Sequence, residues 1–176
     1  MAYCGGPSAQ LQVVDQGITT LSWSGTVAYI PLTQAIDPSK HMAMVLYAGG
    51  GVAGMESYYF WLEANRIVVN CLRSDGSGYA VPVSWQVVKV PTGKVQRGHT
   101  TVNANGTTDI VLPESINLAA AMLNLCHQGR FLGANFEGSV FVNGNLRKHA
   151  TDASKLQSVL VGPTGTIPFS WEVWNQ

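Results

Sequence analysis

The sequence predicts an all-β fold that consists of two tandem, similar antiparallel β-sandwich repeats. The first observation is that the motif Pro-x-Ser-Trp-x-Val occurs twice, at residues 82–87 and 168–173. Its tryptophans, Trp85 and Trp171, are 86 residues apart (171 − 85), about half of the 176-residue chain. The second observation is that apolar residues alternate with small or polar residues around both motifs, which is typical of strands with one face in a core. The third observation is a weaker match between the rest of the two halves.

This weaker match sets the expected boundaries of the repeats. With an offset of 81, Gly98-His99-Thr100-Thr101 aligns with Gly17-Ile18-Thr19-Thr20, and Gly106-Thr107 aligns with Gly25-Thr26. The offset grows to 86 at the Ser-Trp motif, so we expect about six inserted residues, most simply around 149–157. Internal repeats of this kind indicate duplicated structural units. The expected organisation is an N-terminal arm at 1–10, a first repeat at 11–92 and a second at 93–176.

Short segments rich in β-branched and aromatic residues, separated by Gly, Asn, Asp and Pro, predict about six strands in each repeat. In the first repeat they are expected at 11–17, 26–32, 41–48, 57–64, 66–73 and 81–90. In the second repeat they are expected at 94–102, 108–113, 121–128, 139–144, 146–151 (the weakest) and 167–174. The segment 113–126 has helical character alone, but its counterpart contains Pro38, so we predict a turn followed by a strand.

The two tryptophans of the repeated motif are the predicted structural centres of the cores. A domain of about 80 residues has a small core, and truncation of a buried tryptophan costs about 3–5 kcal/mol. We therefore assign Trp85 and Trp171 a structural role and not a ligand-binding one.

The composition argues against several classes of partner. The ten basic and ten acidic residues give a net charge of zero, which disfavours nucleic-acid binding and basic membrane attachment. No apolar segment is long enough to span a membrane, and the first ten residues do not resemble a signal peptide. Charged residues make up only 11% of the chain, against about a quarter in an average protein. We interpret this as a sign of packing between subunits. The cysteines Cys4, Cys71 and Cys126 are widely separated and form no Cys-x-x-Cys pair, so free thiols are expected.

No motif for catalysis, metal binding or cofactor binding is convincing. Residues 49–54 match Gly-x-Gly-x-x-Gly, but a strand and not a helix is expected after them, so dinucleotide binding is not predicted. The histidines His41, His99, His127 and His149 lack metal-binding spacing, and the first two align with Ala or Ile in the repeat. We therefore predict no catalytic residue, metal or cofactor.

Two longer loops, around 48–57 and 128–138, are the remaining candidates for contacts with a partner protein or a glycan. Aromatic and arginine side chains on such loops suit sugar stacking or protein contacts. The predicted contact residues are Tyr58, Tyr59, Arg130, Phe131, Asn135 and Phe136.

The string RIVVNCLRSDGSGYAVPVSWQVVKV, followed by TGKVQRGHTTV, resembles repeat units of phage virion proteins and bacterial surface proteins that end in Val-Ser-Trp-Gln-Val-Val. That pattern is similar to the H-type lectin-like β-sandwich, which has a glycine in its first strand and Ser-Trp in its last. Gly17 and Gly98 match the first feature, and the two Ser-Trp pairs match the second. No sugar-contacting residue of those lectins has a match here, so the resemblance does not imply lectin activity.

The resemblance, together with the low charge and the lack of a catalytic set, leads to the expectation of a non-enzymatic bacteriophage virion protein. It would be a capsid decoration or tail-associated component that works as an oligomer, is assembled in the host cytoplasm, and binds copies of itself and other virion proteins. The alternative is a receptor-binding module of a tail fibre or lectin-like protein that binds host surface glycans. An enzyme such as a polysaccharide hydrolase is the remote third option.

Overall fold

The protein is all-β. The computed structural model describes residues 10–22, 27–47, 57–72, 80–129, 143–161 and 165–175. Within these ranges the chain forms strands that pair only in antiparallel fashion, and there is one short 3-10 turn, η1 (Pro38–Lys40), but no α-helix. The predicted fold class is therefore confirmed at the level of an antiparallel all-β protein.

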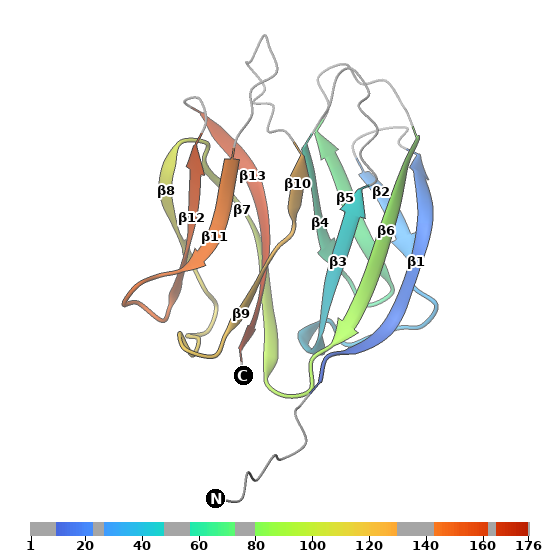
Figure 1. The fold of residues 1–176 in the computed structure, drawn as a ribbon, viewed down its shortest axis with the longest axis horizontal. Coiled ribbons are helices and arrows are strands. Elements are labelled where there is room, and N and C mark those ends of the chain that lie inside the picture. Colours follow the sequence, from blue (N-terminus) through green and yellow to red (C-terminus); the bar gives the residue numbers. More distant parts are fainter. Residues whose placement is uncertain are drawn as a thin grey trace, which may run out of the picture.

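The strands fall into two consecutive groups, which lie beside each other in Figure 1. The first group comprises β1 (Gln12–Ser22), β2 (Val27–Pro31), β3 (His41–Tyr47), β4 (Ser57–Leu62), β5 (Arg66–Leu72) and β6 (Ala80–Lys89). The second comprises β7 (Lys94–Asn103), β8 (Gly106–Val111), β9 (Met122–Leu125), β10 (His127–Gly129), β11 (Asn143–Lys148), β12 (Lys155–Val161) and β13 (Thr166–Asn175).

Each group forms two small sheets with corresponding strand orders. In the first group, one sheet has the order β1-β6-β3 and the other contains β4-β5-β2. In the second group the orders are β7-β13-β9 and β11-β12-β8. In both groups the first strand pairs with one edge of the last strand. The third strand, β3 or β9, pairs with the other edge of the last strand.

A glycine faces each of the repeated tryptophans across the first pair of strands. Gly17 of β1 pairs with Trp85 of β6, and Gly98 of β7 pairs with Trp171 of β13. A Cβ atom added at Gly17 would lie 3.0 Å from the indole Cζ2 of Trp85, and one added at Gly98 would lie 2.6 Å from Cζ2 of Trp171. Both indoles therefore occupy space that any larger residue would need, which explains why glycine stands at these two positions.

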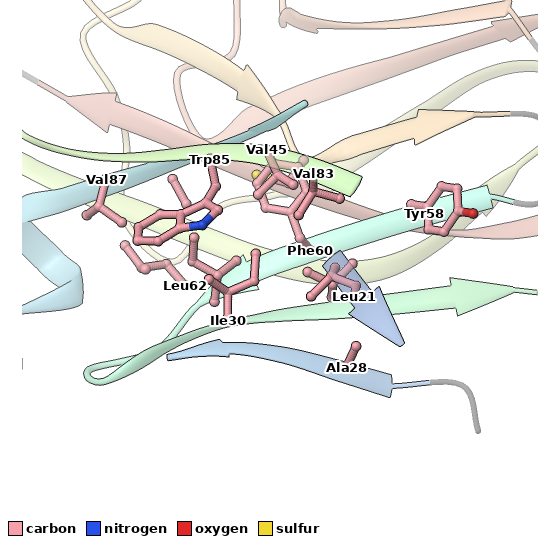
Figure 2. Close-up of a cluster of buried hydrophobic side chains, with 14 residues drawn as sticks. Leu21, Ala28, Ile30, Val45, Tyr58, Phe60, Leu62, Val83, Trp85 and Val87 are labelled. Atoms are coloured by element: carbon pink, nitrogen blue, oxygen red, sulfur yellow. The ribbon is translucent and has the colours of Figure 1, made fainter. Parts of the chain in front are cut away.

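The alternating residues of each group enclose a separate core. Trp85 is 7% exposed and Trp171 is 3% exposed. Figure 2 shows Trp85 among the inward-facing side chains of both sheets of the first group, including Phe60 and Ile30. In the second core, Trp171 packs with residues that include Val102, Ile110, Ala121, Leu156, Phe169 and Val173.

Residues 122–129 connect the two groups. They first form β9 beside β13 and then, as β10, pair with β4 of the first group, so the sheet with β4 has the order β10-β4-β5-β2 (Figure 1). Between these strands, the N–H of Cys126 donates to the carbonyl of Ser170 at 3.1 Å, and the carbonyl of Cys126 accepts from Phe60 at 3.0 Å. The Cys126 side chain is buried in the first core. Residues 126–129 thus pack with the first group, although they follow β7, β8 and β9 in the chain.

One predicted strand is misplaced. Residues 155–161 form β12, the central strand of its sheet, whereas the sequence had suggested that an insertion reaches to 157 and that the strand lies at 146–151. β12 has an interrupted pattern because Ser158 points into the core between Leu156 and Leu160, and all three are buried. The segment 113–126 forms a turn followed by β9, as predicted.

Candidate functional site

The free edge of β3 meets the outer face of the sheet β7-β13-β9, and side chains of the second group bind its backbone. The N–H of Ala43 donates to Oε2 of Glu172 at 3.1 Å, and the carbonyl of Ala43 accepts from Nδ2 of Asn124 at 2.7 Å. The same Asn124 nitrogen also lies 3.0 Å from Glu172 Oε2. A buried strand edge would otherwise leave unpaired backbone groups, at a cost of about 1–3 kcal/mol each. These side chains therefore take the place of a neighbouring strand.

Arg97 completes this network. Its Nε donates to Oε1 of Glu172 at 3.1 Å, and its terminal nitrogens donate to the carbonyls of Pro38 at 2.7 Å and His41 at 2.6 Å. The Glu172 side chain is 1% exposed and that of Arg97 is 18% exposed. Burial raises the pKa of Glu172, although the nearby Arg97 charge opposes this shift. Oε2 of Glu172 and the two terminal nitrogens of Arg97 thus bind the backbone of the first group, while Oε1 and Nε bind each other within the second group. We assign this set a structural role.

Next to this network lies a stack of aromatic rings from both groups. The ring of Tyr59 stacks on the His99 imidazole, with ring centroids 4.8 Å apart, and Trp61 lies 6.1 Å from Tyr59 and 6.0 Å from His99. Nδ1 of His99 lies 3.0 Å from the hydroxyl of Ser170. Burial lowers the pKa of His99 and raises the pKa of Tyr59, because both charged forms lose solvation. At neutral pH both rings are therefore uncharged.

A shallow pocket of about 190 Å³ opens beside this stack and is lined by Trp61, Arg97, Gly98 and His99. Its lining is almost wholly apolar. The guanidinium of Arg97 is bound within the interface, as described above, so its charge is already paired with Glu172. The pocket therefore offers ring faces and aliphatic surface, and no free charge of Arg97.

A second candidate surface is the outer face of the sheet β1-β6-β3. Here Ile18 is 83% exposed, Leu46 is 62% exposed and Met44 is 39% exposed. Ile18 and Leu46 both pair with Ser84, so they lie in one row across the sheet, and Met44 lies in the next outward-facing row, opposite Gln86. We call Ile18, Met44 and Leu46 the apolar face.

The corresponding face of the second group is covered. In the sheet β7-β13-β9, the outward-facing rows contain His99 opposite Ser170, and Arg97 opposite Glu172 and Asn124. These are the side chains that contact β3 and β4 of the first group. The outer face of β7-β13-β9 is thus covered where Arg97, His99 and Glu172 contact the first group. The outer face of β1-β6-β3 leaves Ile18, Met44 and Leu46 exposed beside Ser84 and Gln86, while Met42 and Val88 on the same face are buried against Val95 and Trp174.

The predicted contact residues fall in two regions. Tyr58 and Tyr59 lie within β4, at the position of the strand predicted at 57–64, and β4 pairs with both β5 and β10. They are only 5% and 7% exposed. Tyr58 packs in the first core, and Tyr59 belongs to the stack with His99. The other predicted contact residues, Arg130, Phe131, Asn135 and Phe136, lie outside the described residues.

Sequence reasoning missed the residues that join the two groups: Trp61, Arg97, His99, Asn124 and Glu172. One signal was present, because Glu172 and Arg97 are charged residues in strands of a chain that has few charges. Their contacts depend on how the sheets pack against each other, which the strand pattern does not encode.

Within the described ranges, no three His, Cys, Asp or Glu side chains lie close enough together to hold a metal ion. The same part of the chain contains no helix with the length and apolar character needed to cross a membrane. Comparison with known proteins gives no family model, curated protein or solved structure that matches the chain.

Proposed function

We propose that the chain is a tandem duplication of one β-sandwich and that it serves as a non-enzymatic structural component of a bacteriophage virion. In this role it would decorate the capsid or form part of the tail, bind copies of itself and other virion proteins, and be assembled in the host cytoplasm. The observation that carries the proposal is the exposed apolar face of the sheet β1-β6-β3.

The duplication is supported by topology and by the glycine–tryptophan pairs. The orders β1-β6-β3 and β7-β13-β9 correspond strand by strand, as do β4-β5-β2 and β11-β12-β8. In each half a glycine of the first strand opposes the tryptophan of the last strand. Two unrelated sandwiches would not be expected to share both features.

The role in an assembly is supported by the contrast between the two outer sheet faces. In the second half this face contacts the first half. In the first half the corresponding face exposes Ile18, Met44 and Leu46 to solvent. Ile18 lies on one side of Ser84, and Leu46 and Met44 lie on the other, so three large apolar side chains share this sheet face; an apolar surface of this kind favours contact with another protein. A contact between different faces of identical subunits produces a ring or a filament, which suits a repeated component of a particle.

A structural role without catalysis is supported by the polar groups at the junction. Glu172 and Arg97 are the most deeply buried charged pair that the structure describes, and their polar atoms bind backbone groups and each other. A general acid or base needs a group that can reach a substrate proton, and this carboxylate is enclosed.

The proposal is tested by separating particles from free protein. Lysate from cells that produce the virus is fractionated on a density gradient, and tagged wild-type protein is compared with an Ile18→Ser/Leu46→Ser variant. We expect the wild-type protein to band with the particles and the variant to remain at the top of the gradient. Val111→Ser/Val161→Ser is the matched control, because both valines are exposed, at 71% and 68%, on a different sheet. Wild-type protein that stays free of particles would contradict the proposal.

A second function, binding of host surface glycans, is favoured by the pocket beside Trp61 and His99. Aromatic side chains with a polar edge are suited to ligands that have both apolar and hydroxyl groups.

A further inference from the structure

We infer that the pocket lined by Trp61, Arg97, Gly98 and His99 binds one uncharged six-membered sugar ring of a glycan. This inference rests on the second function proposed above, and it places the ligand at the junction of the two strand groups instead of on the loops around 130–136. The argument uses the size, the lining and the charge of the pocket.

The size and lining of the pocket fit the apolar face of a sugar. A volume of about 190 Å³ is enough for a single hexose ring. Trp61 is partly exposed and forms one wall, and the exposed His99 ring forms another. The C–H groups on one face of a pyranose ring pack against aromatic rings, and ligand pockets combine such apolar walls with a few polar groups that fix orientation.

A carboxylate lies next to the Trp61 wall of the pocket and can accept hydrogen bonds from sugar hydroxyls. The indole Nε1 of Trp61 donates to Oε1 of Glu63 at 3.2 Å, which places this carboxylate next to the Trp61 ring. Glu63 also accepts from Nε of Arg66 at 2.6 Å, and the two side chains are 37% and 42% exposed. Arg66 lies over the ring of Tyr29, with its guanidinium carbon 4.3 Å from the ring centroid. Next to Trp61, Glu63 thus supplies a carboxylate acceptor that is held in place by Arg66.

The charge balance favours a neutral ligand. Glu63 is paired with Arg66, and Arg97 is paired with Glu172. Burial lowers the pKa of His99, so its ring is neutral at physiological pH. A charged sugar would have to give up solvation without gaining an unpaired counter-charge from these side chains. A neutral hexose carries no such penalty.

The test measures binding of simple sugars to the full chain by NMR. The probes are the methyl glycosides of glucose, galactose and mannose, with glucuronic acid and glucosamine as charged counterparts. We expect saturable shifts of the Gly98 and His99 amide signals with at least one neutral glycoside, at millimolar concentrations. Either charged sugar is expected to bind at least about tenfold more weakly, a difference of about 1.4 kcal/mol. Tighter binding of a charged sugar would overturn the inference.

Variants locate the site. Trp61→Ala and His99→Ala are each expected to weaken binding at least about tenfold, while Trp61→Phe keeps a ring face and retains most of the affinity. Ile18→Ser on the apolar face is the control and is expected to bind sugar as the wild type does. Two alanine variants are used because one of them can misfold, which its NMR spectrum would show. The affinity of the folded variant then tests the location of the site.

The outcomes separate this inference from the function on which it rests. If a glycan array detects binding that both alanine variants preserve, glycan binding stands but its site lies elsewhere, and the inference is wrong. If no neutral glycoside and no array glycan binds, both the inference and the glycan-binding function are wrong, while assembly through the apolar face is unaffected.

Discussion

Alanine at Gly98 should destabilise the protein, and should do so more than alanine at Gly17. The new Cβ atom at Gly98 would lie 2.6 Å from Cζ2 and 2.8 Å from Cε2 of Trp171, whereas at Gly17 the closest approach to Trp85 is 3.0 Å. Carbon atoms in contact are normally about 3.5–4.0 Å apart. The indole of Trp171 would therefore have to move by about 1 Å, and it is enclosed by the second core.

The magnitude follows from two opposing contributions. Overpacking of a well-packed core costs about 1–3 kcal/mol, and replacement of glycine by alanine returns about 0.4–1 kcal/mol by restricting the unfolded chain. The difference between these ranges is about 0–2.6 kcal/mol. Because the contact with Trp171 would be only 2.6 Å, we expect Gly98→Ala to lie in the upper part of this range, with a net loss of about 1–2.5 kcal/mol in the free energy of unfolding. Gly17→Ala, with its longer contacts, should stay within about 1 kcal/mol of the wild type.

Urea unfolding followed by circular dichroism measures both changes. A third variant, Gly98→Ala/Trp171→Phe, shows whether the indole is responsible, because a smaller ring leaves room for the new methyl group. Its loss should be smaller than the sum of the two single losses by at least about 0.5 kcal/mol. The reasoning would be refuted if Gly98→Ala were as stable as the wild type, or less harmful than Gly17→Ala.

Three further predictions concern titratable groups. Burial raises the pKa of Glu172, so the folded protein binds a proton there more tightly than the unfolded chain does. The stability of the wild type relative to Glu172→Gln should therefore fall as the pH rises from about 4.5 through the raised pKa. Urea unfolding from pH 4 to 7 measures this change. The hydrogen bond from the Ser154 hydroxyl lowers the pKa of Asp152 to about 2. The contribution of the Asp152 carboxylate to stability is therefore present above the ordinary pKa of 3.8 and is lost as the pH falls through about 2. An NMR titration should show the pKa of Asp152 return toward 3.8 in Ser154→Ala. Burial raises the pKa of the Cys126 thiol well above its usual value. Peptide mapping should therefore find Cys126 unmodified by iodoacetamide at pH 8 in the native protein and modified in urea. Labelling at similar rates in the native protein and in urea would contradict the burial of Cys126.

Local patterns in the sequence predicted the strands well where one face is buried and the other is open. The alternation around Trp85 in β6 is of this kind, and so is that of the residues before Trp171 in β13. The pattern fails where both faces are buried or where a polar residue faces the core. In β12, buried Ser158 interrupts the alternation of Leu156 and Leu160, so the sequence predicts no strand at 155–161 and places 155–157 in an insertion.

The candidate site could not be predicted because it depends on how the two strand groups pack. The sequence aligned His99 with Ile18 and suggested a tolerant position, but the two residues lie on faces with different surroundings. Tyr59 lies in a predicted strand next to a glycine-rich segment, and the sequence favours contact with a partner at this position. In the structure β4 pairs with strands from both groups, so Tyr59 is buried at their junction. A local pattern carries no information on such pairing between distant segments.

The central claim, that the chain acts by self-assembly through Ile18, Met44 and Leu46, is tested most directly by sedimentation velocity of the purified protein over a range of concentrations. The account predicts that the wild type and Val111→Ser/Val161→Ser form the same oligomer, and that Ile18→Ser/Leu46→Ser sediments as a folded monomer of 18.8 kDa. A wild-type protein that remains monomeric at all concentrations, or an oligomer that the Ile18→Ser/Leu46→Ser variant preserves, would contradict it.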